Sequence, residues 1–351
     1  MHGDGLFGSR IWNVVPSTNV NPVLVELKHG DGIESRHRGI AIIIDADGTV
    51  QESWGDTSQI VCLRSAIKPI QALALIESGA FEALGLSDEQ LTLACASHNG
   101  EPMHVERVHA WLARIGCDES DLACGPHGPS HRRSAEEFQS AGKIATRATN
   151  GCSGKHAGFL SIARHLGSPT SECCALEGPV QQRVLSSVAE LADLDLGGLG
   201  SNLDFCNAPN LFAPFDRFAL AFARMTDASK AGRHGPAAEK ILDAIGRHPA
   251  LLGGSDRFCS DLTLAAGPNL IAKSGAEGVY VVFLRRERRV ILVKIDDGAD
   301  RAAPVVCCAL LERIGRLRPT ARKMLRQYRY APFLSSTGET IGVLKPNARL
   351  A

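Results

Sequence analysis

The sequence predicts an α/β protein in which strands from both ends of the chain form an antiparallel sheet and a helical region lies between them. Residues 39–53 are rich in β-branched residues around Asp47-Gly48, a dipeptide typical of hairpin turns. A second hairpin pattern occupies 278–284 and 290–295, while apolar residues between the two hairpins recur mainly at helical spacing. Strands that come as hairpins argue against a doubly wound parallel sheet, which is built from strand–helix–strand units.

The remaining elements follow in chain order. A short strand is expected at 23–27, before the first hairpin. Ser87 and Gln90 match a capping box and begin a helix that ends near Ala96. An amphipathic helix is expected from Pro102 to Ile115. Further helices are predicted at 134–143, 153–166, 179–193, 215–227 and about 302–317.

The domain organisation follows from this layout. We expect a flexible N-terminus over 1–15 and a single domain over 16–351, in which the helical region at about 65–260 is inserted between the sheet strands. The last thirty residues contain three prolines and are expected to return loosely across the surface.

Composition narrows the class of protein. Lys and Arg number 38 and Asp and Glu also 38, so a net charge of zero gives no basis for binding nucleic acid or anionic membranes. No apolar run approaches the roughly 18 residues of a membrane span. The first ten residues lack the features of a signal peptide, so a cytoplasmic location is expected. Eleven irregularly spaced cysteines favour free thiols and metal or catalytic use over a disulfide framework.

The first chemical motif is the pair Ser65 and Lys68, at the start of an apolar, alanine-rich run. Residues three apart share one helix face, so the amine is expected to reach the serine hydroxyl and act as its base. Such an S-x-x-K pair serves this purpose in penicillin-binding proteins and class A β-lactamases. Pro69 suits the first turn of the helix. The alternative is a serine that caps the helix, followed by a lysine that extends to water.

A second cluster contains thiols. Cys152 precedes a predicted helix that carries His156, and Cys206 follows Asp204 in a turn-rich loop. These are sensible zinc ligands, and spacing alone selects Cys152, His156 and Cys206, with Asp204 as a fourth ligand or a neighbour of one. The alternative is two loop thiols and a histidine at a helix start, without metal.

A third candidate is Lys273, which follows Asn269 and precedes a glycine-rich entry to the second hairpin. In the penicillin-binding group a lysine on an edge strand lines the same cleft as the S-x-x-K helix. As a lone residue, Lys273 also fits a solvated strand end.

Together these segments resemble one family. R-S-x-x-K-P-x-Q, C-A-S-H-N-G-E, C-S-G-K-H-A-G, D-x-C-x-x-P and K-x-G-A-E-G extend from Arg64 to Gly278 and are similar to motifs of the Rhizobium-etli-type (class 3) L-asparaginases, also called asparaginase II. The resemblance implies the fold of serine β-lactamases and penicillin-binding proteins, a homodimer, and hydrolysis of L-asparagine to L-aspartate and ammonia through a serine acyl-enzyme.

The resemblance also implies roles for individual residues. The catalytic groups would be two serine–lysine pairs, Ser65 with Lys68 and Ser97 with Lys273, with Ser65 as the nucleophile and Ser97 as the second choice. The substrate-binding residues would be Arg64, His98, Asn99, Gly254, Cys259 and Glu277. The zinc ligands would be Cys152, Lys155 and Cys206, with His156 and Asp204 close by. Zinc would orient the substrate and would not activate water.

Two departures from the family pattern concern the metal site. Gly151 stands where asparagine is frequent, and Phe205 stands where glycine is usual. The competing hypotheses are another serine–lysine amide hydrolase on the same fold, acting on β-lactams or D-peptides, and a non-enzymatic zinc-binding protein. The first would need a periplasmic signal and would not need the two thiols. The second would not explain two serine–lysine pairs.

Overall fold

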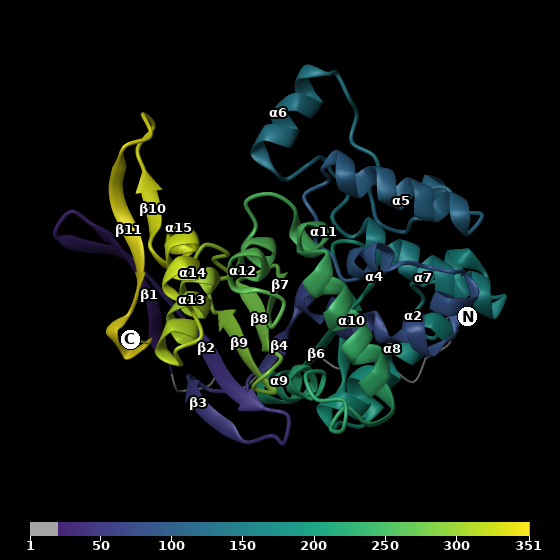
Figure 1. The fold of residues 1–351 in the computed structure, drawn as a ribbon, viewed down its shortest axis with the longest axis horizontal. Coiled ribbons are helices and arrows are strands. Elements are labelled where there is room, and N and C mark those ends of the chain that lie inside the picture. Colours follow the sequence, from purple (N-terminus) through teal and green to yellow (C-terminus); the bar gives the residue numbers. More distant parts are fainter. Residues whose placement is uncertain (1–19, 351) are drawn as a thin grey trace, which may run out of the picture.

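A computed structural model describes residues 20–350 of the protein, and its largest element is an antiparallel sheet (Figure 1). The strand order is β10-β11-β1-β2-β9-β8-β7, and β3 pairs with β2. The strands are β1 (Val23–His29), β2 (Gly32–Asp45), β3 (Val50–Trp54), β7 (Leu270–Gly275), β8 (Val279–Leu284), β9 (Arg289–Ile295), β10 (Ala331–Leu334) and β11 (Thr340–Pro346). The predicted α/β class and both hairpins are confirmed, whereas the expected flexible segment 1–15 lies outside the described residues.

The central strands pair chain segments that are far apart in the sequence. Ile42 of β2 lies opposite Leu292 of β9, which joins the two predicted hairpins directly. All six residues of β8 are buried. Helices packed against the sheet include α9 (Phe215–Arg224) and α13 (Ala303–Arg313). Strands buried on both faces carry almost continuous apolar runs, and the sequence of β8 is of this kind.

The middle of the chain forms the helical part on the opposite side of the molecule from β10 and β11 (Figure 1). Its helices are α1 (Lys68–Gln71), α2 (Leu73–Glu77), α3 (Ala80–Ala83), α4 (Asp88–Ala94), α5 (Pro102–Arg114), α6 (Arg132–Ser140), α7 (Ser153–Leu166), α8 (Pro179–Ala192), α10 (Gly235–Arg247), α11 (Pro249–Gly253) and α12 (Phe258–Ala266). The predicted capping box of Ser87 and Gln90 is present at the start of α4. Within residues 20–350, no helix is long and apolar enough to cross a membrane.

The structure differs from the expected secondary structure in two places. The last thirty residues are regular, with α14 (Pro319–Met324), α15 (Arg326–Arg329), β10 and β11. Here β11 pairs with β1 from Gly342 to Pro346, so long-range strand pairing overrides the signal of the prolines. The helical region also contains a small sheet that the helical spacing did not reveal, formed by β4 (Ile60–Cys62), β6 (Pro209–Pro214) and β5 (Gly200–Leu203).

Candidate active site

A cavity of about 610 Å³ lies between the helical region and the edge of the sheet at β7. Its wall includes both predicted serines, Ser65 and Ser97. Other lining residues come from segments far apart in the sequence, among them His98, Cys152, Arg257 and Ser274. A volume of this size is in the range of pockets that bury small-molecule ligands. The cavity is therefore the candidate active site.

Ser97 lies between two lysines. Its hydroxyl oxygen accepts hydrogen bonds from the Lys68 amine at 3.1 Å and from the Lys273 amine at 2.9 Å. Lys68 reaches it from the start of α1 and Lys273 from the middle of β7. The predicted contact between Ser97 and Lys273 is present.

Lys273 is fully buried, which excludes the alternative of a solvated strand end. Burial and, next, the positive charge of Lys68 lower the pKa of Lys273 to about 7. The amine also donates to the carbonyl of Ser274 at 2.5 Å. A lysine with a pKa near neutrality is a competent general base, because a large fraction of it is unprotonated at physiological pH.

Ser65 lies in a different type of element from the one expected. The chain forms a 3-10 helix, Arg64–Ile67, followed by two short helices, α1 and α2, in place of one continuous helix. Arg64 has a φ of 51°, which is unusual for a residue with a side chain. Local backbone strain of this kind is found mainly at functional sites. Ser65 is only half-buried and lines the cavity.

The Lys68 amine does not reach Ser65 as the sequence spacing predicts. Its hydrogen-bond acceptors are the carbonyl of Ala96 at 2.5 Å, the Ser97 hydroxyl and the Cys152 thiol at 3.2 Å. A buried ammonium needs several acceptors, and the facing loop after α4 provides two of them. In the part of the chain described, no hydrogen bond joins Ser65 to either lysine.

His98 and Asn99 follow Ser97 and are both buried. His98 Nδ1 accepts the backbone N–H of Gly100 at 3.1 Å, so Nε2 carries the proton and donates to the Ser153 hydroxyl at 3.0 Å. Burial lowers the pKa of His98 well below its ordinary value, which keeps the ring neutral. Asn99 donates to Glu101 and to the carbonyl of Ser255. These contacts make His98 part of the cavity wall and Asn99 a support behind it.

The other predicted substrate-binding residues lie at different distances from the cavity. Gly254 has a φ of 100°, and a Cβ there would lie 2.9 Å from Glu101 Oε1 and 3.0 Å from Asn99 Nδ2, so only glycine fits. Cys259 donates to the Ser274 hydroxyl at 3.2 Å and lies behind this lining residue. Glu277 is exposed in the turn between β7 and β8 and is not part of the cavity wall.

The three predicted zinc ligands come together. The Lys155 amine donates to Cys206 Sγ at 2.9 Å, and the Cys206 thiol shares a hydrogen bond with Cys152. This hydrogen bond, more than any other cause, lowers the pKa of Cys152 well below its ordinary value. Burial would lower the pKa of Lys155, but the charges of the two sulfurs outweigh it and raise the pKa.

Two sulfurs and an amine nitrogen are suitable donors for zinc, provided that the metal displaces the amine proton. Within residues 20–350, no three His, Cys, Asp and Glu side chains are close enough to hold a metal ion, so a zinc site here needs Lys155. The convergence of these three side chains fits the group that the resemblance implies.

The histidine that spacing selected has other contacts. His156 Nδ1 lies 3.5 Å from the Cys174 sulfur, and its buried Nε2 has no hydrogen-bond partner. One helical position separates it from Lys155, and this turns it to a different side of α7. Asp204 lies 3.8 Å from Cys206 and forms an ion pair with Arg64 at 2.8 Å. Asp204 therefore connects the thiols to the residue before Ser65.

Sequence reasoning missed two short motifs that the structure places at the cavity. The triplet Ser97-His-Asn and the triplet Lys273-Ser-Gly275 correspond to S-D-N and K-T-G, which accompany S-x-x-K in penicillin-binding proteins and class A β-lactamases. A Cβ at Gly275 would lie 2.3 Å from the carbonyl oxygen of Leu63, so glycine lets β7 approach the segment that carries Ser65. A search for all three motifs would have found Ser274 and Gly275.

A family model of L-asparaginase II matches residues 25–346. The chain belongs to the L-asparaginase II family. None of the curated proteins matches the sequence significantly. This asparaginase II protein is accordingly a hydrolase, and a small-molecule amide suits the cavity.

Several solved structures are similar to this asparaginase II protein. A β-lactamase from Mycobacterium bovis is 14% identical, with 78% of this chain and 94% of that chain covered and a TM-score of 0.40. A D-alanine carboxypeptidase, AmpC, from Burkholderia cenocepacia is 13% identical, with 76% and 91% covered and a TM-score of 0.36. Mglu in its native form is 15% identical, with 79% and 64% covered and a TM-score of 0.44.

Proposed function

We propose that this protein hydrolyses the side-chain amide of L-asparagine to L-aspartate and ammonia through an acyl-enzyme on Ser65. The observation that carries the proposal is the arrangement of Lys68, Ser97 and Lys273 in one hydrogen-bonded chain, beside Ser65 in the same cavity. Membership of the asparaginase II family supports the amide as the reacting group.

In the first step, the Ser65 oxygen attacks the amide carbon, and its proton passes to the hydrogen-bonded chain of Lys68, Ser97 and Lys273, in which unprotonated Lys273 is the base. Ser65 is the better nucleophile candidate because it is half-buried on the cavity wall, whereas the Ser97 hydroxyl is already bonded to two amines. A tetrahedral intermediate with a negative oxygen then forms. Backbone N–H groups at the start of the 3-10 helix, Arg64–Ile67, would donate to that oxygen.

In the second step, the carbon–nitrogen bond breaks and the leaving nitrogen takes a proton. The Ser97 hydroxyl can donate to one amine while it accepts from the other, so it can pass a proton from a lysine to the leaving group. Lys273, with a pKa of about 7, can hold a proton or release it during this exchange. Ammonia departs, and an aspartyl ester remains on Ser65.

In the third step, water attacks the ester carbon, and the ester oxygen of Ser65 recovers its proton from the same chain. Cys152, Lys155 and Cys206 would hold a zinc ion at the wall of this cavity. A bound zinc ion would supply positive charge that orients polar groups of the substrate. Because Lys68 contacts both Ser97 and Cys152, it couples the serine side of the site to the thiol side.

The direct test is ammonia release from L-asparagine, beside L-glutamine and a chromogenic cephalosporin, by wild type, Ser65→Ala and Ser97→Ala. We expect asparagine to be the best substrate and Ser65→Ala to lose at least about 1,000-fold in kcat, as for other catalytic nucleophiles. Near-normal activity of Ser65→Ala would transfer the nucleophile role to Ser97. Hydrolysis of the cephalosporin alone would replace the proposal with a β-lactam hydrolase, the second candidate that the three motifs support.

Identifying the acylated serine requires a covalent probe. An electrophilic diazoketone analogue of asparagine should label one serine, and peptide mass spectrometry should find the adduct on the peptide that contains Ser65. Ser65→Ala is the matched control and should remain unlabelled. We also propose the homodimer that the family resemblance implies, and light scattering should give about twice the chain mass.

A further inference from the structure

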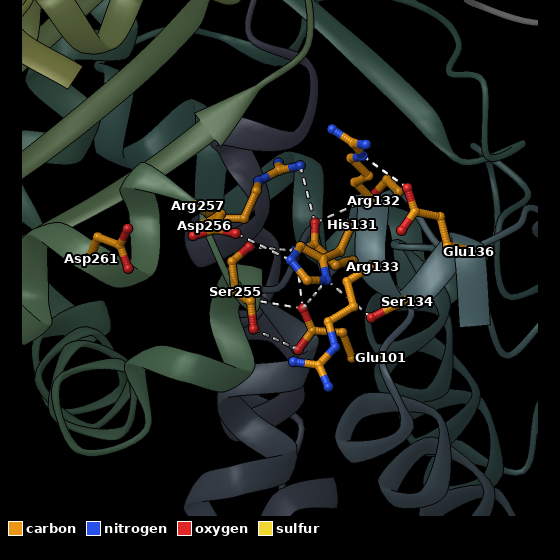
Figure 2. A network of polar contacts seen from close by, with 12 residues as sticks. Glu101, His131, Arg132, Arg133, Ser134, Glu136, Ser255, Asp256, Arg257 and Asp261 are labelled. Carbon is orange, nitrogen blue, oxygen red and sulfur yellow. Dashed lines mark hydrogen bonds and ion pairs between the residues drawn. The ribbon is translucent and has the colours of Figure 1, made fainter. Parts of the chain in front are cut away.

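Arg257 is a positively charged side chain on the cavity wall that no described carboxylate neutralises. The guanidinium has one hydrogen bond, to Asn99 Oδ1 at 3.4 Å, and residues 20–350 provide no ion-pair partner for it. The neighbouring Asp256 contacts His131 at 3.2 Å and not Arg257. Figure 2 shows this arrangement, with the Arg257 guanidinium reaching away from Glu101. Most of its donors are therefore available to a ligand in the cavity.

The other cations near the cavity are already engaged. Arg64 forms its ion pair with Asp204. The amines of Lys68 and Lys273 are hydrogen-bonded to Ser97. Arg301 also lines the cavity, and its guanidinium donates to His37 and Ser35 on β2. Among these cations, Arg257 is the one whose guanidinium keeps most of its N–H donors unused.

The loop that carries Arg257 is held in a fixed position. The buried carboxylate of Glu101 accepts the backbone N–H of Ser255 at 2.9 Å, the Ser255 hydroxyl at 3.3 Å and the Asn99 amide at 3.2 Å. Gly254 packs so closely against the Glu101 and Asn99 side chains that a Cβ would not fit. Figure 2 shows Glu101 and His131 facing this loop. A guanidinium that is held in place loses less side-chain entropy when it binds a ligand.

The charge of Arg257 also acts on the reacting groups. After burial and Lys68, it is among the causes that lower the pKa of Lys273. It also contributes to the lowered pKa of His98, after burial and two other groups. Arg257 is therefore electrostatically close to the serine–lysine chain, at a position where a substrate anion would be attracted.

We propose that Arg257 binds the α-carboxylate of the substrate and makes the enzyme selective for amides of amino acids over amides without a carboxylate. The planar fork of an arginine matches the two oxygens of a carboxylate in a way that a lysine does not. This inference rests on the proposed function, because it takes the reacting amide to be the side chain of an amino acid. Arg257 is then a specificity-determining residue.

The test compares three amides that differ in one charged group. L-Asparagine has both the α-amino and the α-carboxylate group, succinamate retains only the carboxylate, and 3-aminopropanamide retains only the amine. Ammonia release from each is measured with wild type, Arg257→Gln, Arg257→Lys and Arg301→Gln. Arg301→Gln is the matched control, because it removes a guanidinium from the same cavity wall.

We expect Arg257→Gln to lower kcat/KM for asparagine and succinamate by about 10- to 100-fold, mainly through KM, as for loss of charged hydrogen bonds. The value for 3-aminopropanamide should change by less than about threefold. Arg257→Lys should recover part of the loss, and Arg301→Gln should leave the preference among the three amides as in wild type. Equal losses for all three amides in Arg257→Gln would overturn the inference, because they would indicate a structural or general catalytic role.

A binding measurement separates this inference from the proposed function. Calorimetry with L-aspartate, the product, should show at least about tenfold weaker binding to Arg257→Gln than to wild type. Unchanged aspartate binding in an active enzyme would overturn only the role of Arg257. A wild type that hydrolyses none of the three amides would overturn the proposed function, whatever aspartate binding shows.

Discussion

Lys273 and Lys155 are both buried beside a nucleophilic side chain, and yet their pKa values shift in opposite directions. Lys273 contacts the neutral Ser97 hydroxyl, and burial together with the charge of Lys68 lowers its pKa to about 7. Lys155 contacts the Cys206 sulfur, and the charges of the sulfurs raise its pKa against the effect of burial. Burial alone therefore does not make a lysine a base, because the charge of the neighbouring group sets the direction of the pKa shift.

Lys68 connects these two regions, because its amine contacts Ser97 on one side and Cys152 on the other. The serine side is therefore suited to proton transfer and the thiol side to holding a cation, either the ammonium of Lys155 or a metal. Four measurements test this division between the serine side and the thiol side.

The largest expected effect comes from removing each amine in turn. Lys273→Met replaces the amine with an apolar side chain of similar length. The variant lacks the base, so kcat/KM should fall by about 100- to 10,000-fold. In Lys155→Met, kcat/KM should fall by only about tenfold, and added zinc should not restore it, because the metal site needs the Lys155 amine. Thermal melting of both variants controls for misfolding. Equal losses in two folded variants would show that the division between the regions is wrong.

The pH dependence should follow Lys273. Because the base must be unprotonated and its pKa is about 7, log kcat/KM should rise with unit slope up to that pH and then level off. Activity is thus lost as pH falls below 7, by about tenfold per unit. The pKa of His98 is well below its usual value, so His98 should become protonated only at a more acidic pH than Lys273. A profile that is flat between pH 5.5 and 7 would exclude Lys273 as the base.

Zinc binding should depend on the thiol side alone. After dialysis against trace zinc, mass spectrometry of the metal should find about one zinc per chain in wild type and much less in Cys206→Ser, since a structural site needs its full set of ligands. Cys174→Ser is the matched control, because this thiol contacts His156 and not Lys155. His156→Ala should also retain zinc. Loss of zinc in that variant would instead support the ligand set that spacing selected.

The smallest effect provides a baseline for stability. Ser87 caps α4 through the Gln90 backbone N–H, and Ser87→Ala should cost about 1 kcal/mol of unfolding free energy. Denaturant unfolding measures this loss, and kcat should stay within about twofold of wild type because neither lysine is touched. A large loss of activity in Ser87→Ala would mean that a small destabilisation of the helical region also disturbs the active site. The activity losses of the lysine variants would then have to be corrected for their loss of stability.

The hairpins, most of the helices and the candidate residues of the site could be predicted from the sequence. Period-2 and period-3.6 patterns, the capping box at Ser87 and the turn at Asp47-Gly48 are local signals, and the structure contains each of them. The motifs also identified Ser97 and Lys273 as a pair, although 176 positions separate them in the chain.

Only the tertiary structure decided which partner each buried amine meets. Spacing predicted that Lys68 contacts Ser65 and that His156 accompanies Cys152, but the facing loop after α4 attracts Lys68, and one helical step turns His156 toward Cys174. The strand pairing of β11 with β1 and the small sheet in the helical region are likewise invisible in any local window. Local pattern specifies an element and its face, whereas hydrogen-bond partners and pKa values depend on groups that only the folded chain brings together.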